Sequence, residues 1–437
     1  MNSTLVRCVL VGALAGLMFG FDTAVIAGAT SGLTATYHLT PAGLGFTVSA
    51  ALWGTLAGAM IAGWPGDRYG ARFCLRVIAV LYVVSGVGCL VAWSWPALIC
   101  FRIAAGLAIG ASSVVAPVYI AEVAPPERRG LMVGAFQFNI VLGILVAYLS
   151  NYLVGSVALG PDEWRWKFAV TAAPAVLLFA MMFTIPQSPR WLALKGRIAE
   201  ARAVLDRIGV ADSAGAVETY ARGSGNAGAA AMKLSWTEYR KPIVLAFGIA
   251  AFNQLSGINA ILYYLNDIFA AAGFSKVSAD IQSIIIGATN LTFTALALLV
   301  IDRFGRRRLL LVGSIGLIVA LTGTAAIMFT GQGRGLLLWM LVGFVGSFAF
   351  SQGAVIWVYI SEVYPTEVRA RGQSLGASTH WAIDALIAGG FPVIAAVSKG
   401  APFVFFAAMM VVQFIVVLMV FPETKRFALE DIGRAVG

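Results

Sequence analysis

The chain has 437 residues, of which 60% are hydrophobic and only 11% are charged, and its mean hydropathy is +0.87. A soluble globular domain carries about 25% charged residues, so this composition excludes a surface that is wetted all round and indicates one that faces lipid. The formal net charge of +10 does not indicate a nucleic-acid partner, because the basic residues are spread over short segments rather than gathered in one patch.

Twelve apolar stretches follow one another, each close to the ~20 residues that a helix needs to cross ~30 Å of hydrocarbon. The alternating pattern of barrel strands is absent, so we expect an all-α membrane protein. The first stretch carries Asp22, and we expect it to be a retained span rather than a signal peptide. The predicted spans are 6–28, 43–64, 73–93, 96–119, 131–154, 167–186, 242–266, 278–301, 308–329, 335–360, 373–397 and 401–421.

Lysines and arginines are distributed unevenly between the two sides of the predicted membrane. With an even number of spans, both ends of the chain lie on one side, where the connecting segments carry 24 of these residues against five on the other. Because cytoplasmic loops are enriched in lysine and arginine, we expect both termini and the long central segment in the cytoplasm.

Three short motifs occur twice, in the same order, at offsets of 240, 235 and 236 residues. Residues 118–123 recur at 358–363, 67–70 at 302–305 and 186–190 at 422–426. These repeats predict a six-helix bundle at 1–186, a cytoplasmic linker at 187–241 and a second bundle with a short tail at 242–437. Two parallel six-helix repeats indicate the major facilitator fold, with a solute site near mid-membrane. In the linker, residues 197–208 predict a surface helix that ends at Gly209.

Few ionisable side chains lie deep in the predicted spans: Asp22, Arg102, His380 and Asp384. A charge at the bilayer centre costs at least ~2.5–3.5 kcal/mol, so each should have a partner or face a cavity. We expect Asp22 and Arg102 to pair, either as a functional site or as a static bridge. His380 and Asp384 share one helix face, and they form either a second titratable pair or a structural one.

Five segments spread over the chain resemble signatures of the sugar porter family of the major facilitator superfamily. They are residues 16–22, 117–125 with 129–130, 186–192, 254–259 with 263–264, and 422–425. Because they run from the first span to the last, the resemblance covers the whole chain. It implies twelve helices in two six-helix repeats and the import of a monosaccharide by proton symport with alternating access.

The resemblance also implies roles for individual residues. In coupled members an aspartate at the position of Asp22 accepts the transported proton, with an arginine at the position of Arg102 as its partner; passive members tend to have an amide there. The implied sugar ligands are Phe19, Gln137, Asn253, Gln254, Asn259, Asn290, Trp357, His380 and Trp381. Amides suit a hydroxyl-rich solute, although polar residues in spans can instead join neighbouring helices. Gly257, inside this group, is a position where a helix can break.

Repeated charges at the cytoplasmic helix ends look like the family's inner gate, which latches the halves while the cavity faces outward. The alternative is that these charges only enforce topology. The residues are Asp67, Arg68, Glu122, Arg129, Asp302, Arg303, Glu362 and Arg369.

Four positions depart from the family pattern. Asn253 stands where the family usually has glutamine, and Gln187 where it has glutamate, so one cytoplasmic contact should be weaker. His380 and Asp384 stand where uncharged residues are expected.

The sequence therefore predicts a proton-coupled monosaccharide symporter of a bacterial-type inner membrane, acting as a monomer without cofactor or metal. The sequence contains no P-loop and no catalytic constellation. Residues 223–228 match a dinucleotide-binding fingerprint, but no predicted strand precedes them, so we dismiss this match. The first alternative is a passive facilitator of a sugar or polyol, against which Asp22 argues; import of a polyol such as inositol in place of a sugar stays open. The second is a non-transporting sugar sensor, which the short segment after Phe421 disfavours.

Overall fold

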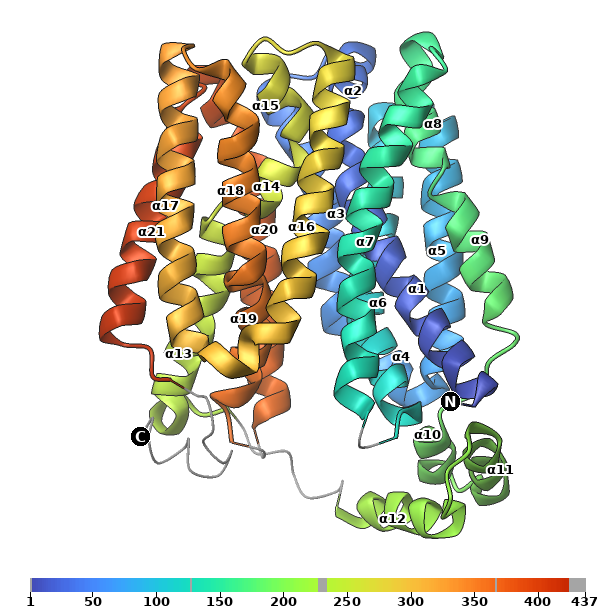
Figure 1. Ribbon diagram of the computed structural model, residues 1–437. Helices are drawn as coiled ribbons and strands as arrows, with labels where there is room; N and C mark the ends of the chain where they lie inside the picture. Colours follow the sequence, from blue (N-terminus) through green and yellow to red (C-terminus); the bar gives the residue numbers. More distant parts are fainter. Residues whose placement is uncertain (1, 126–127, 227–233, 366–367, 424–437) are drawn as a thin grey trace. The chain divides into compact units, whose positions relative to one another are not determined.

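The computed structural model describes residues 2–125, 128–226, 234–365 and 368–423 (Figure 1). Within these ranges every regular element is a helix, which confirms the predicted fold class. In the described part of the chain, eleven helical segments are long and apolar enough to cross a membrane. The sixth predicted span is divided into two shorter helices, α8 (Glu163–Ala169) and α9 (Ala172–Met181). Pro174 explains the division, because it has no N–H to donate to the carbonyl four residues earlier.

The other predicted spans each correspond to one helix or to a broken one. Before residue 189 the elements are α1 (Ser3–Val25), η1 (Ile26–Gly28), α2 (Thr30–Tyr37), α3 (Pro41–Ile61), α4 (Gly63–Tyr69), α5 (Ala71–Val91), α6 (Trp95–Val123), α7 (Arg129–Ser156), η3 (Gly160–Asp162), α8 and α9. After residue 234 they are α13 (Trp236–Leu255), α14 (Ile258–Tyr263), α15 (Leu265–Ala271), α16 (Lys276–Phe304), α17 (Arg306–Thr330), η4 (Arg334–Leu336), α18 (Leu337–Phe350), α19 (Gln352–Glu362), α20 (Arg369–Val397) and α21 (Ala401–Met419).

Three helices form the predicted linker: α10 (Pro189–Leu194), α11 (Ile198–Ile208) and α12 (Ser213–Asn226). Gly209 ends α11 in the left-handed region at φ 86°, which confirms the predicted surface helix and its stop. Leu205 and Ile208 of α11 belong to the same buried cluster as Leu5 of α1. Figure 1 shows the three helices beside the start of α1, beyond the end of the long helices.

Two predicted spans of the second repeat are broken near the middle. Gly257 separates α13 from α14 with φ 82°, at the position where the sequence predicts a break, and a Cβ there would meet the ring of Phe406. Ser351 separates α18 from α19 with φ −118° and ψ −87°. Broken helices free backbone groups, and these are tolerated at membrane depth only inside protein or along a cavity.

Contacts divide the chain into two compact units. The first contains Met1–Thr23, Trp53–Ala147 and Arg165–Ala231, and the second contains Ala24–Leu52, Tyr148–Trp164 and Met232–Gly437. Two segments of the first sequence repeat thus cluster with the helices of the second repeat. The functional division at 1–186, 187–241 and 242–437 stays a prediction.

Small residues let two helices of the first unit approach closely. A Cβ on Gly20 of α1 would meet the backbone carbonyl of Ile140 on α7, and one on Gly143 would meet that of Leu17. Such contacts between small residues are a main source of helix association in lipid. They fix α1 against α7 immediately before Asp22.

Candidate functional site

Asp22 and Arg102 form a buried ion pair in the first unit. Arg102 Nη1 on α6 donates to Asp22 Oδ2 on α1 at 3.1 Å. The two residues are each 3% exposed, so neither charge is screened by bulk water. The pairing that the sequence predicts from opposite sign is confirmed.

The guanidinium of Arg102 has further neighbours on α8 and within its own unit. Its Cζ lies 5.1 Å from the ring centroid of Phe168, within the range of a cation–π contact. Its Nε is buried and has no hydrogen-bond partner among the described residues. Arg102 is thus held by one carboxylate and one ring, and the loss of Asp22 would leave its charge without the main compensation.

Gln254 lies at the centre of a polar network in the second unit. Its Nε2 is 2.9 Å from Nε2 of His380 and 3.3 Å from Oδ1 of Asn253. Asn253 in turn donates to the backbone carbonyl of Gln352 at 3.4 Å, next to the break at Ser351. The network joins α13, α19 and α20, and it places three predicted sugar ligands together.

Asp384 has partners of its own, one turn along α20 from His380. Its Oδ2 accepts hydrogen bonds from Asn259 Nδ2 at 2.8 Å and from Tyr263 Oη at 3.2 Å. The residue is 1% exposed, and Oδ1 has no hydrogen-bond partner in the described part of the chain. The structure therefore gives His380 and Asp384 different partners, on α13 and α14.

Aromatic rings surround His380. The ring centroid of Trp357 on α19 lies 5.1 Å from that of His380, and the centroid of Trp381 lies 4.9 Å from it. Trp357 is 38% exposed, whereas Trp381 is buried. An accessible indole beside amide groups can receive the apolar C–H face of a sugar ring while the amides bind hydroxyls.

Three predicted ligands lie outside this network. Asn290 on α16 is buried, and its Oδ1 is 3.5 Å from the hydroxyl of Thr294. Phe19 on α1 and Gln137 on α7 belong to the first unit, and both are half-buried.

The charged helix ends of the first unit show a chain of backbone contacts. Gln187 accepts from the backbone N–H of Arg72, at the start of α5, at 3.1 Å and donates to the carbonyl of Tyr69 at 3.3 Å. Arg72 Nε donates to the carbonyl of Met182 at 3.0 Å, and the hydroxyl of Tyr119 donates to that of Pro186 at 2.9 Å. The amide of Gln187 thus caps the start of α5, but it lacks the negative charge that would be stabilising near a helix N-terminus.

The second unit repeats this arrangement with a carboxylate. Glu423 accepts from the backbone N–H groups of Arg306 and Arg307, at the start of α17, at 2.9 and 3.2 Å. The hydroxyl of Tyr359 donates to the carbonyl of Pro422 at 3.3 Å. Each of these residues matches one in the first unit at the repeat offset, so the duplication extends to individual hydrogen bonds.

One ion pair breaks the symmetry. Arg306 Nη2 lies 2.9 Å from Oε1 of Glu362, but the residue at the equivalent position of the first repeat is Ala71. Glu122, the counterpart of Glu362, instead has Ser188 as a hydrogen-bond neighbour and Arg190 and Asp67 as charged neighbours. The sequence prediction missed Arg306 because the charge is present in only one repeat.

The remaining predicted gate residues are placed as follows. The backbone carbonyl of Asp67 accepts from the indole of Trp191 at 3.0 Å, and the guanidinium of Arg68 lies over Trp64. Arg129 is exposed at the start of α7, and Arg369 Nε donates to the carbonyl of Tyr364 at 3.3 Å. The side chains of Asp302 and Arg303 lie outside the described residues.

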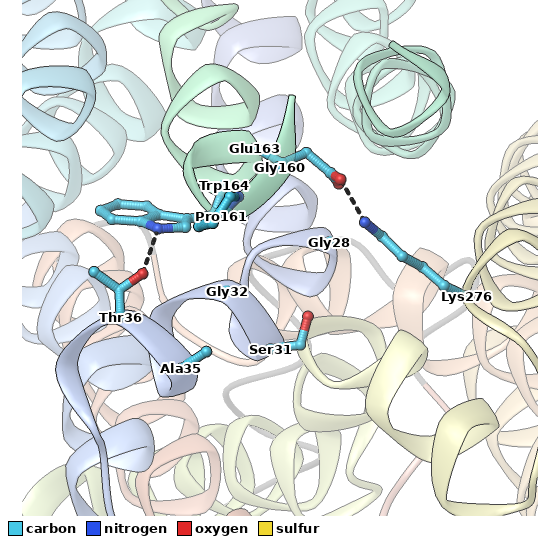
Figure 2. A pocket seen from close by; sticks show the side chains of 10 residues that line it. All are labelled: Gly28, Ser31, Gly32, Ala35, Thr36, Gly160, Pro161, Glu163, Trp164 and Lys276. Carbon is cyan, nitrogen blue, oxygen red and sulfur yellow. Dashed lines mark hydrogen bonds and ion pairs between the residues drawn. The ribbon is translucent and has the colours of Figure 1, made fainter. Parts of the chain in front are cut away.

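A small cavity of about 200 Å³ lies in the second unit where α2, η3 and α8 meet the start of α16. Figure 2 shows the ammonium of Lys276 paired with the carboxylate of Glu163, and the indole N–H of Trp164 bonded to Thr36. Glu163 belongs to the first sequence repeat and Lys276 to the second, so this pair links the repeats.

Further contacts within the second unit link the same two repeats. The hydroxyl of Tyr148 donates to the carbonyl of Leu262 at 3.0 Å. A Cβ on Gly45 would meet the backbone carbonyl of Gly389, so α3 and α20 approach closely there. These contacts explain why residues 24–52 and 148–164 belong to the second unit. Within the described residues, no group of three or more His, Cys, Asp or Glu side chains is arranged to hold a metal ion.

Comparisons with known proteins agree with this geometry. Residues 8–436 match the family model described as sugar (and other) transporter. The chain is 31% identical to the D-xylose-proton symporter of Escherichia coli, over 99% of this chain and 95% of that protein. It is 33% identical to the arabinose-proton symporter of Bacillus subtilis, over 96% and 92%. The inward-open structure of the xylose transporter from Escherichia coli matches with a TM-score of 0.87 and 31% identity, over 99% of each chain.

Proposed function

The chain belongs to the family of sugar (and other) transporters, and from this membership and its buried charges we propose that it imports a monosaccharide together with a proton. The observation that carries the proposal is the ion pair between Asp22 and Arg102, 3.1 Å apart and almost fully buried. A static bridge would add little over apolar packing. Relatives named as proton symporters of xylose and arabinose support the same reading.

Coupling follows from the exchange of partners at Asp22. The adjacent guanidinium of Arg102 stabilises the ionised carboxylate, and its withdrawal within an apolar surrounding favours the protonated form. A conformational change that separates the pair therefore loads a proton, and one that restores the pair releases it. The movement that exposes the sugar site also separates and restores this pair. Proton loading and release therefore accompany sugar transport, and the two fluxes are coupled.

The sugar site is the network of Asn253, Gln254 and Asn259, with Trp357 and Trp381 as its apolar walls. The amide groups bond to one another and to α20. A hydroxyl-rich solute can replace these contacts one for one, since each amide has both donors and an acceptor. Asn290 on α16 completes the proposed ligand set within the second unit.

We place the protein in a bacterial inner membrane as a functional monomer, with both termini and α10 to α12 in the cytoplasm. The excess of lysine and arginine on that side supports this orientation. The contacts of Lys276 with Glu163 and of Tyr148 with Leu262 then lie toward the outer face. They close the outer end, and they have to separate when the site opens outward.

The cytoplasmic charges form the inner gate in this proposal. Glu122 and Glu362, each at the end of a helix that bears a repeated motif, act with Arg129 and Arg369. The ion pair with Arg306 holds the carboxylate of Glu362 in place.

Uptake into proteoliposomes tests the function. A panel of pentoses, hexoses and polyols is offered with and without an inward proton gradient. Symport predicts accumulation above the external concentration only with the gradient. Equal rates toward equilibrium under both conditions would instead indicate a passive facilitator, and binding without any uptake would indicate a sensor.

A further inference from the structure

A second and larger cavity, of about 570 Å³, lies in the second unit away from the sugar network. Its walls come from the loop between α2 and α3, from α15, from the end of α20 and from the start of α21. Most of the lining is apolar and includes Leu44, Met328 and Phe391. Its volume falls within the roughly 300–1,000 Å³ that small-molecule sites occupy.

One carboxylate lines this apolar cavity. Asp267 on α15 faces it. Thr30 is a hydrogen-bond neighbour of this carboxylate, but the buried Oδ2 atom has no hydrogen-bond partner among the described residues. A buried charged oxygen without a donor is costly. The cavity therefore lacks a hydrogen-bond donor, preferably a cationic one, at this point.

A cation lines another part of the same cavity. Lys399, just after α20, donates to the carbonyl of Ala271 at 3.0 Å. An ammonium carries three N–H groups, and this one is exposed, so it can also receive an anion. The cavity thus presents one acidic and one basic group on otherwise apolar walls.

Exposed apolar side chains lie close in sequence to residues that line the cavity. Phe46, Val397 and Val404, each next to or near a lining residue in sequence, are 50%, 87% and 48% exposed. In a membrane-spanning chain such side chains face lipid. The molecule that reaches this cavity most readily is therefore an amphiphile from the bilayer rather than a solute from water.

We propose that this cavity is a binding site for a phospholipid whose head group carries a primary ammonium, namely phosphatidylethanolamine. Its ammonium donates to Asp267, its phosphate accepts from Lys399, and its acyl chains lie along the apolar wall at Phe391. The quaternary ammonium of phosphatidylcholine has no N–H to donate to Asp267, and the head group of phosphatidylglycerol carries no cation. The site therefore distinguishes phosphatidylethanolamine from phosphatidylcholine and from phosphatidylglycerol.

Native mass spectrometry of the full-length, delipidated protein tests the assignment, with three phospholipids that share the same acyl chains. Phosphatidylethanolamine should bind about tenfold or more tightly than phosphatidylcholine, as a charge-assisted hydrogen bond predicts. Asp267→Asn should remove this preference and leave phosphatidylglycerol binding unchanged. Lys399→Gln should weaken all three lipids. Asp206→Asn and Lys195→Gln, exposed changes in the linker, are the matched controls.

Two results would overturn the proposal. A preference for phosphatidylethanolamine that persists in Asp267→Asn would place the lipid elsewhere. Displacement of the lipid by soluble glycerophosphoethanolamine at equal concentration would show that the head group alone is the ligand. An unchanged melting temperature in both variants shows that they are folded, and it keeps this test independent of the transport proposal.

Discussion

Arg102 Nη1 lies 3.1 Å from Oδ2 of Asp22, and the two side chains are 3% and 4% exposed. The contact joins α1 to α6 across 80 residues of sequence. Because each group compensates the charge of the other, a change to either one leaves the other buried charge without its partner.

Replacing Asp22 by asparagine keeps the shape of the side chain but makes it permanently neutral. We expect proton-driven accumulation of sugar to disappear while exchange of sugar across the membrane continues, since the sugar ligands are unchanged. Counterflow and gradient-driven uptake in the same vesicles measure the two activities. Asp206→Asn, on the exposed face of α11, is the control. Accumulation by Asp22→Asn vesicles in an acid medium would move the coupling site elsewhere, first to His380 and Asp384.

Truncation of Gln254 tests the sugar network. A lost hydrogen bond to a bound polar ligand costs about 1–3 kcal/mol, so Gln254→Ala should weaken sugar binding about 5- to 150-fold. Equilibrium binding of radiolabelled sugar is the measurement. Gln282→Ala removes another buried glutamine, which bonds Ser278 within α16 at 2.9 Å, and it should leave the affinity unchanged. Wild-type affinity in the Gln254 variant would exclude this residue from the site.

Breaking the pair of Lys276 with Glu163 should ease outward opening. In a Cys100→Ser background, a cysteine at Ser31, which lines the adjacent cavity, should react faster with an impermeant thiol reagent once Lys276 is changed to glutamine. Arg197→Gln is the control, because it breaks an exposed pair with Glu200. Hydrogen bonds from Arg197 lower the pKa of the Glu200 carboxylate in this pair. The control substitution should not change the labelling rate. Equal rates in all three proteins would show that the outer pair does not restrain opening.

The pair of Arg306 with Glu362 should stabilise the second unit. Changing either residue to an uncharged amide leaves its largely buried partner without compensation, which costs about 3–5 kcal/mol for a fully buried pair and less here. A double-mutant cycle on the free energy of unfolding should therefore give a positive coupling energy. The same cycle with Glu122 and Ala71→Arg asks whether the first repeat accepts the pair. If the effects of the two single substitutions on the free energy of unfolding simply add in the double mutant, the contact between Arg306 and Glu362 does not stabilise the protein.

Gly257 should tolerate no side chain. Alanine there must adopt φ near 82° and place its Cβ against the ring of Phe406, and strain of this kind costs about 1–3 kcal/mol. We expect Gly257→Ala to lower the melting temperature and the sugar affinity together, because the break orients Gln254 and Asn259. Gly134→Ala, a helical position with no atom within 4 Å of the new Cβ, should be neutral or slightly stabilising. A melting temperature that is unchanged in the Gly257 variant would contradict the strain.

The sequence by itself determined the helices, the break at Gly257 and the charged pair. Apolar length sets a span, a glycine with no Cβ permits the left-handed turn at Gly257, and Gly209 ends α11 for the same reason. These are local properties, so they can be read without the fold. The pairing of Asp22 with Arg102 was also predictable, because opposite charges deep in apolar spans have few other partners.

Only the tertiary structure decided which side chains of distant segments meet. The repeat suggests equal contacts in both halves, but Arg306 faces Glu362 where the first repeat has Ala71. His380 and Asp384, four residues apart, bond to different helices because α13 and α14 change direction at Gly257. Residues 24–52 and 148–164 likewise join the second unit through packing that no local pattern encodes. Such contacts depend on how helices approach in space, and sequence periodicity carries no information about that approach.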